Sequence, residues 1–522
     1  KKHLPCYSNY LDTRYFQEAF ENVLEIDFNE NRVPFGTDIV YNCKNMENLS
    51  VAVEIGDDAF VPITPSMRHI LNGASLIVNP TAFARLVGEN GQRKECIKAL
   101  AARLHAVYIS SSAGAGESTQ DVLYSSAKLI VEDQTILEES CDPETEVICT
   151  DVDLELISAV RRKLNTYKLR EDDYKVIDFE FDCVELELNR YIEKFPWIRN
   201  ESVEEYEELL LIQALGLKKR MEHTGLKAVV IGLSGGLDST LALLVAVKTF
   251  ELMKLNKNNI YTITMPGFGT TGRTYHNACK LAKVLGVSLE EINISAAVRQ
   301  HFSDIGQDMS MHDVTYENAQ ARERTQILMD IANMRAALVV GTGDLSELAL
   351  GWATYNGDHM SMYSVNASVP KTVMRRMLNA LAEGLENNEL KHILKDVVDT
   401  PVSPELLPSD GSKQGHKTED IVGPYELHDF FIYYSLIYGF TASKIYRMAC
   451  RAFANEFTRA EIYKWLYTFY KRFFSQQFKR SCMPDSAKAT VLSLSGRVDL
   501  SMPSDVSAKL WMKELEQIGE NL

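Results

Sequence analysis

Residues 232–240 read Gly232-Leu233-Ser234-Gly235-Gly236-Leu237-Asp238-Ser239-Thr240, and they are the most informative motif in the second half of the chain. An apolar run over 228–231 precedes it and an apolar run over 241–247 follows it, which predicts a β-strand, a tight glycine turn and a helix start. The paired glycines let the backbone bend sharply and approach a ligand closely. Because the helix N-terminus offers free N–H groups and the positive end of a dipole, the turn predicts an anion site.

Asp238 is the unusual member of this turn, because a carboxylate repels a phosphate unless a cation lies between them. With the hydroxyls of Ser234, Ser239 and Thr240 beside it, the turn predicts a cradle for a phosphate and a divalent metal ion. It is not a Walker A loop, which needs a lysine after its second glycine. It resembles the SGGxDS loop of the ATP pyrophosphatase family, whose members split ATP to AMP and pyrophosphate. The alternative interpretation is a glycine-rich βα turn without a ligand.

The composition is that of an acidic globular protein. At 522 residues the chain is long enough for two or more domains. A net charge of −17 argues against a nucleic-acid or anionic-membrane surface as the main function, and no apolar run reaches bilayer length. The nine cysteines are scattered without a CxxC pair, which favours free thiols over disulfides or a zinc site. We therefore expect a cytoplasmic protein that binds neither nucleic acid nor membrane.

Two α/β domains are predicted, with the boundary between residues 195 and 196, where Phe195-Pro196-Trp197 interrupts the pattern. Residues 1–195 alternate short apolar strands with helix-like stretches, which indicates a layered α/β domain. The strands expected there are 51–55, 74–78 and 106–109, and the helix expected there is 93–104.

Residues 196–522 follow a βαβα pattern, which predicts a doubly wound, Rossmann-like parallel sheet with a helical C-terminal part. Ligands of such sheets bind outside the carboxyl ends of the strands, where the candidate motifs fall. The strands expected are 228–231, 260–265, 288–294 and 337–340, and the helices expected are 204–222, 277–285 and 316–334.

A second glycine turn at 341–347 carries two carboxylates, Asp344 and Glu347. We predict that Asp238 and Glu347 share one Mg²⁺, an ion that favours a few carboxylates together with substrate phosphates. The alternative is that Asp344 and Ser346 only cap the following helix.

Further along the chain, Trp352 and Tyr355 could stack on a planar ring, and Lys371 could meet a phosphate as a point charge. Arg322 could pair with a phosphate, and the basic segment around Lys479 could bind an anionic dinucleotide. The plainer interpretation is that the two aromatic residues belong to the core and that Arg322 and the segment around Lys479 are solvated surface.

Taken together, residues 203–522 resemble the synthetase domain of the NAD synthetase family. The motifs that carry the resemblance are M-P-G-F-G-T-T at 265–271, Y-E-N-A-Q-A-R at 316–322, G-T-G-D-L-S-E-L-A-L-G-W-A-T-Y at 341–355, V-N-A-S-V-P-K at 365–371 and G-P-Y-E-L-H-D-F at 423–430. The resemblance implies ATP-binding residues Gly232, Leu233, Ser234, Gly235, Gly236, Leu237, Asp238, Ser239, Thr342 and Lys371. It implies contacts to nicotinic acid adenine dinucleotide (deamido-NAD) from Asn318, Arg322, Glu347, Trp352, Ala353, Thr354, Tyr355 and Lys479. Gly272 departs from the acidic residue that many relatives carry after the Thr-Thr pair.

Residues 1–195 resemble the nitrilase-like, glutamine-hydrolysing domain of the glutamine-dependent members of that family. Lys1 and Tyr7 match its triad lysine and glutamine-pocket tyrosine, whereas the triad glutamate would precede Lys1. Gly56 stands where the family has its nucleophilic cysteine, and glycine cannot form a thioester. Phe83 and Glu89 also replace polar and basic residues of the family's pocket. We therefore expect this domain to be inactive as a glutaminase.

The expected reaction is the ATP-dependent amidation of deamido-NAD to NAD through an acyl-adenylate, with release of AMP and pyrophosphate. Free ammonia, or ammonia from a partner, would replace glutamine. The resemblance also implies a homo-oligomer, possibly an octamer as in other two-domain members.

Several alternatives stay open. One is a glutamine-dependent enzyme inactivated deliberately at Gly56. Another is a different amidating or thiolating ligase with the same loop, such as a GMP synthetase, an asparagine synthetase or a tRNA-thiolating enzyme. A third is a scaffold in which both domains have lost activity.

Overall fold

The computed structural model describes residues 17–20, 22–169, 173–180, 182, 188, 190–268, 272–400 and 418–520. Lys1 and Tyr7 lie outside these residues, as do positions 269–271 of one motif. The chain forms two compact units, Lys1–Tyr191 and Ile192–Leu522. Among the helices described, none is both long enough and apolar enough to cross a membrane. The seven cysteines in the described ranges all carry free thiols.

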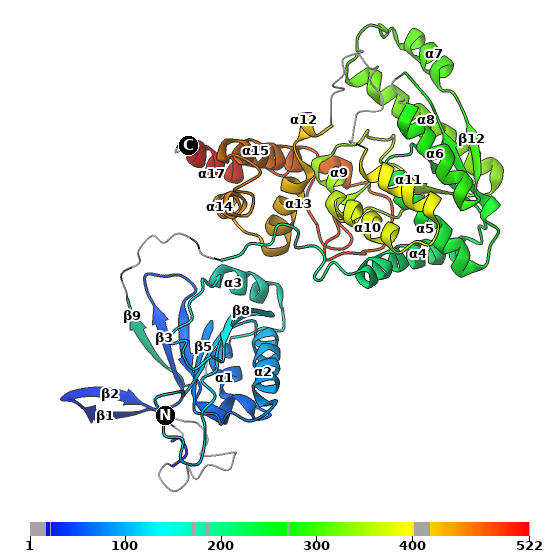
Figure 1. Cartoon of the computed structure of the whole chain (residues 1–522). Coiled ribbons are helices and arrows are strands. Elements are labelled where there is room, and N and C mark those ends of the chain that lie inside the picture. The colour runs from blue at the N-terminus through cyan, green and yellow to red at the C-terminus, as the bar shows by residue number, and fades with distance from the viewer. Residues whose placement is uncertain are drawn as a thin grey trace. The chain divides into compact units, whose positions relative to one another are not determined.

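The first unit is built on a mixed seven-stranded sheet with the strand order β8-β7-β6-β5-β4-β3-β9 (Figure 1). A separate antiparallel pair, β1 and β2, precedes it. The strands are β1 (Leu24–Phe28), β2 (Asn31–Phe35), β3 (Ile39–Cys43), β4 (Ser50–Val53), β5 (Leu76–Thr81), β6 (Val107–Ser112), β7 (Lys128–Glu132), β8 (Thr135–Ser140) and β9 (Lys175–Phe179). The helices are η2 (Gly56–Phe60), α1 (Pro65–Leu71), α2 (Glu89–Leu104) and α3 (Leu154–Lys163).

Both faces of this sheet are covered, as the apolar runs of its central strands require. Successive residues of β5 and β6 point to opposite faces. Ile77 and Tyr108 pack in one cluster with residues of α1 and α2. Leu76 and Val107 pack on the other face against Ile157 of α3. The layered α/β fold expected for this part of the chain is therefore confirmed.

The second unit contains an all-parallel five-stranded sheet with the order β12-β11-β10-β13-β14. Its strands are β10 (Val229–Gly232), β11 (Ile260–Thr264), β12 (Ser288–Glu291), β13 (Leu338–Gly341) and β14 (Tyr363–Ser364). The chain adds β11 and β12 on one side of β10 and then returns to place β13 on the other side. The predicted doubly wound sheet is thus confirmed, and its winding reverses between β10 and β13, where such sheets bind ligands.

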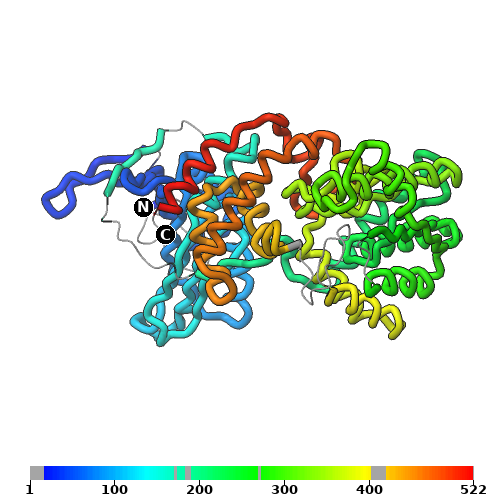
Figure 2. Tube along the Cα trace, turned by 90° about the horizontal axis from the view of Figure 1, so that it is seen from above, coloured from blue at the N-terminus to red at the C-terminus, as the bar shows by residue number. Residues whose placement is uncertain are grey.

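Helices cover this sheet and extend beyond it. Val298 and Phe302 of α7 and Tyr316 of α8 pack on Val230 and Val339 of the sheet. The C-terminal helices α13, α14, α15 and α17 pack together, in orange and red in Figure 2. The helices are α4 (Val203–Thr224), α5 (Leu237–Met253), η3 (Lys257–Asn259), α6 (Gly272–Leu285), α7 (Ser295–Ile305), α8 (Val314–Arg335), α9 (Leu345–Leu350), α10 (Lys371–Glu383), α11 (Asn388–Val398), α12 (Thr418–Val422), α13 (Tyr425–Tyr433), η4 (Tyr434–Tyr438), α14 (Ala442–Ala452), α15 (Arg459–Ser475), α16 (Gln477–Arg480) and α17 (Lys509–Gly519).

Candidate active site

The glycine turn lies between β10 and α5, as its sequence predicts. Gly235 has φ +81°, and a Cβ atom there would lie 2.0 Å from the carbonyl oxygen of Thr274 on α6. Only glycine therefore fits this backbone. The backbone N–H of Gly236 donates to Ser234 Oγ at 3.2 Å, and Ser234 Oγ lies 3.2 Å from Ser239 Oγ. The turn is thus held by its own hydroxyls, with α5 beginning directly behind it.

The start of α5 is suited to an anion. Its N-cap is Gly236, and among the side chains that the structure describes none caps this helix end. Leu237, the first residue of the helix, is buried, so packing fixes the place of this helix end. The positive end of the helix dipole and the first N–H groups therefore face the carboxyl end of the sheet.

The second glycine turn lies between β13 and α9, next to the first turn because β13 pairs with β10. Asp344 is fully buried and its Oδ1 accepts a hydrogen bond from the Glu347 backbone N–H at 2.9 Å. The expected alternative, a helix cap, is therefore correct for Asp344. Ser346 is not a cap, because its hydroxyl donates instead to Asp429 on α13.

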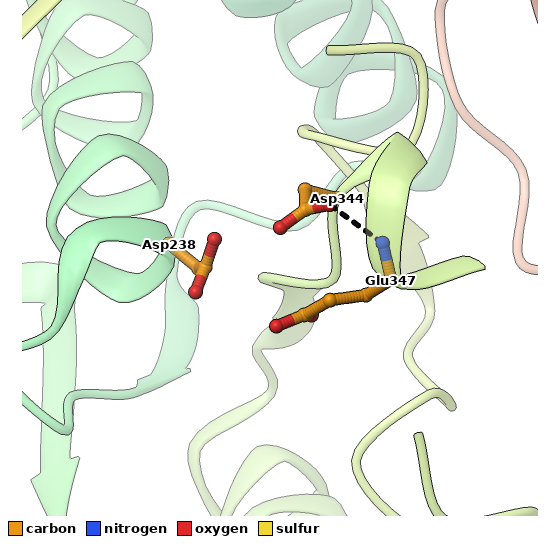
Figure 3. A group of neighbouring side chains, drawn as sticks. All are labelled: Asp238, Asp344 and Glu347. Atoms are coloured by element: carbon orange, nitrogen blue, oxygen red, sulfur yellow. Dashed lines mark hydrogen bonds between the residues drawn. The ribbon is translucent and has the colours of Figure 1, made fainter. Parts of the chain in front are cut away.

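Three carboxylates meet where the two turns come together: Asp238, Asp344 and Glu347 (Figure 3). One oxygen from each lies within 4.8 Å of the oxygens of the other two. The sequence predicted the pair Asp238 and Glu347 and regarded Asp344 only as a cap. Mg²⁺ is usually bound by one or two carboxylates together with substrate phosphates, so these carboxylates are the residues of the site that could hold such an ion.

Lys371, the first residue of α10, places its ammonium group among these carboxylates. Its Nζ lies 2.6 Å from Asp238 Oδ1, 2.5 Å from Asp344 Oδ2 and 3.0 Å from Glu347 Oε1, and its side chain is 1% exposed. Burial by itself lowers the pKa of Lys371, but the three carboxylates outweigh burial and hold that pKa well above its ordinary value. Burial also raises the pKa of Glu347 to about 7, against the opposing effect of Lys371.

Asn366 ties the two turns to each other, and the sequence reasoning missed it. Its side-chain amide donates to the backbone carbonyls of Asp238 and Thr342, both at 3.0 Å. Gln213 of α4 donates in turn to Asn366 Oδ1 at 3.1 Å. The signal in the sequence is its place in the V-N-A-S-V-P-K motif at 365–371, and in the structure Asn366 is fully buried. Asn366 therefore fixes the distance between the carboxylates of the two turns.

The residues predicted to contact the substrate lie on α8 (Asn318 and Arg322), on α9 (Glu347), on the segment after α9 and on α16 (Lys479). Thr354 Oγ1 donates to Asn318 Oδ1 at 2.8 Å, and Arg322 Nε donates to the carbonyl of Tyr355 at 3.3 Å. Lys479 donates to the carbonyl oxygens of Gly351 and Ala353, at 2.7 Å and 2.6 Å. The structure thus brings these residues together through their backbone as much as through their side chains.

Two aromatic rings border this segment. The Tyr355 side chain is exposed, and its ring stacks on His359 with centroids 5.3 Å apart at 28°. The guanidinium of Arg472 lies over Trp352, 5.2 Å from the ring centroid.

Two cavities are lined in part by residues 353–360, within or just after this segment. One of about 460 Å³ is lined by Arg322 and Asn356, and one of about 40 Å³ by Thr342, Glu347 and Ala353. The smaller cavity therefore adjoins the carboxylate cluster, and the larger one has the volume of a small-ligand site.

In the first unit, Gly56 begins the short helix η2 with φ +61°, a conformation that favours glycine. Asn79 donates from Nδ2 to the carbonyls of Glu54 and Gly56, at 3.0 Å and 3.2 Å. The buried Glu54 carboxylate accepts from the Ser66 N–H at 2.7 Å and from Tyr108 Oη at 2.6 Å. Asn79 thus holds the Gly56 backbone in place, and this position offers no side chain for chemistry.

In the first unit, Phe83 and Glu89 both contact the side chain of Arg93. Phe83 is 6% exposed and lies edge-on to Phe60, with ring centroids 5.6 Å apart. The Arg93 guanidinium lies over the Phe83 ring, 4.1 Å from its centroid, and pairs with the Glu89 carboxylate at 2.6 Å. Phe83 and Glu89, which the sequence placed near the family's glutamine pocket, thus both contact Arg93.

Comparison with known proteins gives consistent matches. The model of the family described as NAD synthase matches residues 211–435. The glutamine-dependent NAD(+) synthetase of Mycobacterium leprae (strain TN) is 34% identical over 555 positions, covering 99% of this chain and 82% of the relative. The enzyme of that name from Mycobacterium tuberculosis is 35% identical with the same coverage. The solved structure of a glutamine-dependent NAD(+) synthetase from Cytophaga hutchinsonii superposes with a TM-score of 0.49 at 19% identity, covering 97% of this chain and 79% of that one.

Proposed function

Because this chain belongs to the glutamine-dependent NAD(+) synthetase family and is a carbon–nitrogen ligase of that family, we propose that it converts deamido-NAD to NAD with ATP and ammonia. The observation that carries the proposal is the meeting of two turns at the switch point of the sheet. One turn presents a helix N-terminus, and the other presents carboxylates around Lys371. This combination suits a nucleotide triphosphate held with a divalent cation.

The chemistry requires ATP because a carboxylate is a poor electrophile whose leaving group would be oxide. An oxygen of the nicotinate carboxylate bonds to the α-phosphorus of ATP, and the bond from that phosphorus to the bridging oxygen breaks. Pyrophosphate leaves with the electron pair. The nitrogen of ammonia then bonds to the acyl carbon, AMP departs, and the nitrogen loses a proton. No residue of this chain needs to become a covalent nucleophile.

The residues 232–239 would hold the departing pyrophosphate with the N–H groups at the start of α5. Lys371 would stabilise the negative charge that develops on the phosphates, a role in which a fixed cation in a dry site is effective. Asp238 and Glu347, with Asp344, would hold Mg²⁺, which when bound neutralises phosphate charge. Lys371 and Mg²⁺ would then share these carboxylates. The backbone of Thr342 would contact ATP, and the Asn366 side chain holds this backbone by donating to the Thr342 carbonyl oxygen.

Deamido-NAD would bind along α8 and the segment 351–355. Asn318, Arg322, Thr354 and Tyr355 are already joined by hydrogen bonds in this region, as given above. Trp352 or Tyr355 would stack on the nicotinate ring. Ala353 and Lys479 would orient the same segment, since the Lys479 ammonium is bonded to two of its carbonyls.

For the first unit we propose a nitrilase-like domain, spanning residues 1–195, without glutaminase activity. Gly56 supports this proposal because it has no thiol, and Phe83 and Glu89 support it because they are packed with Arg93. Lys1 and Tyr7 would then be vestiges of the triad and of the glutamine pocket. Free ammonia, or ammonia from a partner, would supply the nitrogen.

The test supplies purified protein with deamido-NAD, ATP and Mg²⁺, and adds either ammonium chloride or glutamine. We expect NAD, AMP and pyrophosphate in equal amounts with ammonium and no NAD with glutamine. Glutamine-driven turnover at a comparable rate would refute the nitrogen-source proposal. Absence of NAD with ammonium would refute the synthetase proposal itself.

A Gly56→Cys variant tests whether the missing cysteine alone accounts for the absence of glutaminase activity or whether other residues of the pocket also contribute. A cysteine at φ +61° is strained but is the residue type that amide hydrolysis needs. If Gly56 is the only lesion, this variant gains glutamine-driven NAD formation. If Phe83 and Glu89 have also closed the pocket, it does not, and we expect this second result.

We further propose that the chain assembles as a homo-oligomer, as the resemblance of its sequence motifs to the NAD synthetase family implies, with an octamer as one possibility. Sedimentation velocity over a range of protein concentrations tests this. A single boundary at the mass of one 58.9 kDa chain would contradict it.

A further inference from the structure

The helices α9 and α10, which carry Glu347 and Lys371, begin beside each other and are joined by one buried carboxylate. That carboxylate is Asp429 of α13, which is 1% exposed. We infer that Asp429 is a positioning residue: it clamps the first turns of α9 and α10 together and so sets Lys371 Nζ against the carboxylate cluster. This inference rests on the proposed function, because it assigns Asp429 a task in the same site.

Each carboxylate oxygen of Asp429 holds a different helix. Oδ1 accepts the hydroxyl proton of Ser346 on α9. Oδ2 accepts from both the backbone N–H and the Oγ1 hydroxyl of Thr372 on α10, at 2.9 Å and 2.6 Å. The Ser346 hydroxyl also accepts the backbone N–H of Lys371 at 2.9 Å, which closes the clamp. A single side chain thus satisfies donors from two helix N-termini.

The clamp acts one residue away from the charged groups. Ser346 adjoins Glu347 in sequence, and Thr372 adjoins Lys371. Asp429 therefore acts on the reaction by placing these two residues, whose Nζ and Oε1 atoms lie 3.0 Å apart. A displacement of about 1 Å in a site of this kind can cost about 100-fold in rate.

A carboxylate suits this position better than an amide. All three groups that face Asp429 Oδ1 and Oδ2 are donors, namely the Ser346 hydroxyl and the two Thr372 groups. An asparagine would turn an NH₂ group toward one side, so at least one buried donor would lose its acceptor. The negative charge is also favourable at the N-termini of two helices.

The backbone of α13 is itself anchored, which makes Asp429 a fixed point. Trp197 Nε1 donates to the Asp429 carbonyl oxygen at 3.1 Å. Independently, the Leu345 N–H donates to the Val369 carbonyl at 3.1 Å, so α9 and the residue pair before α10 are joined at a second place. Loss of Asp429 should therefore loosen the register of α9 and α10 while the fold of the unit persists.

The experiment compares Asp429→Asn with Glu426→Gln in ammonium-dependent NAD formation. Glu426 is a matched control because it lies on the same helix and pairs with α10 through Arg375 at 3.2 Å, but it contacts neither Ser346 nor Thr372 in the structure described. A second pair, Thr372→Val and Thr372→Ser, removes or keeps the hydroxyl that bonds Asp429. Unfolding is followed by tryptophan fluorescence, because all four tryptophans lie in the second unit.

We expect kcat of Asp429→Asn to fall about 10- to 100-fold, with KM for deamido-NAD changed less than threefold. Thr372→Val should lose kcat in the same direction, and Thr372→Ser should restore it. Glu426→Gln should keep kcat within about twofold of the wild type. The Mg²⁺ concentration for half-maximal activity should rise in Asp429→Asn and stay unchanged in Glu426→Gln.

Three results overturn the inference while leaving the proposed function intact. One is a wild-type kcat in Asp429→Asn. A second is a loss that appears equally in Glu426→Gln. A third is a loss in Thr372→Val that Thr372→Ser does not restore. If Asp429→Asn does not fold, the comparison of kcat between Thr372→Val and Thr372→Ser tests the inference instead. A wild-type protein that makes no NAD from ammonium refutes the proposed function instead.

Discussion

Replacing Lys371 with methionine should destabilise the protein, because the Lys371 ammonium group offsets the repulsion between three neighbouring carboxylates. The methionine side chain ends one atom short of the ammonium position and carries no charge, so Asp238, Asp344 and Glu347 face one another without a counter-ion. At separations of 2.5–3.0 Å, each charge contact is worth about 6 kcal/mol in gross terms at an effective dielectric constant of about 20. The cost of burying Lys371 offsets much of this sum.

We expect a net loss of about 3 to 5 kcal/mol in the free energy of unfolding without divalent cations, the usual result of removing one partner of a buried ion group. Added Mg²⁺ should stabilise Lys371→Met more than the wild type, because the ion no longer shares the carboxylates with an ammonium group. The kcat for NAD formation should fall about 100-fold or more, as for other losses of fixed charge stabilisation.

The assay is urea unfolding followed by tryptophan fluorescence, with EDTA and then with excess Mg²⁺. Arg375→Met is the matched control, because Arg375 lies on the same helix in a half-exposed pair with Glu426 and its loss should cost less than about 1 kcal/mol. Equal midpoints for Lys371→Met and the wild type in EDTA, or equal gains from Mg²⁺, would refute the account of Lys371 as the internal cation of this cluster.

Two further predictions follow from buried geometry. Gly235→Ala should lower the free energy of unfolding by about 2 to 5 kcal/mol and raise KM for ATP at least about tenfold, because the new Cβ would lie 2.0 Å from the Thr274 carbonyl oxygen in a left-handed backbone. Urea unfolding and steady-state kinetics compare it with Gly496→Ala, where the nearest atom to the new Cβ is 3.5 Å away. Equal behaviour of the two variants would contradict this prediction. Burial lowers the pKa of His428 to about 4, although the Val422 carbonyl opposes this. Between pH 6.5 and 4 the unfolded chain therefore binds the extra proton, so stability present above pH 6.5 is lost as pH falls, by about 3 kcal/mol from this residue. Unfolding at pH 7.5 and 5 should show a smaller loss for His428→Gln than for the wild type, and parallel losses would count against it.

Local sequence patterns were sufficient for the architecture. The strand, glycine turn and helix at 228–247 appear as β10 and α5, and the expected helix 204–222 appears as Val203–Thr224. The expected strand 288–294 was too long, since β12 ends at Glu291 and the chain then turns into α7. These features depend on neighbours a few residues apart, which is the range that periodicity and turn residues report.

The glycine turn at 232–240 and the strand–helix alternation around it thus predicted the parallel sheet, which the structure confirms, and predicted a phosphate site at the end of β10. The contacts among the side chains at this site became visible in the tertiary structure alone. Lys371 reaches Asp238 across 133 residues, and Asp429 reaches Ser346 across 83. Such contacts arise because β13 returns beside β10 and because α13 packs behind α9 and α10. The order of strands and the packing of helices set those distances, and no local spacing in the sequence contains them.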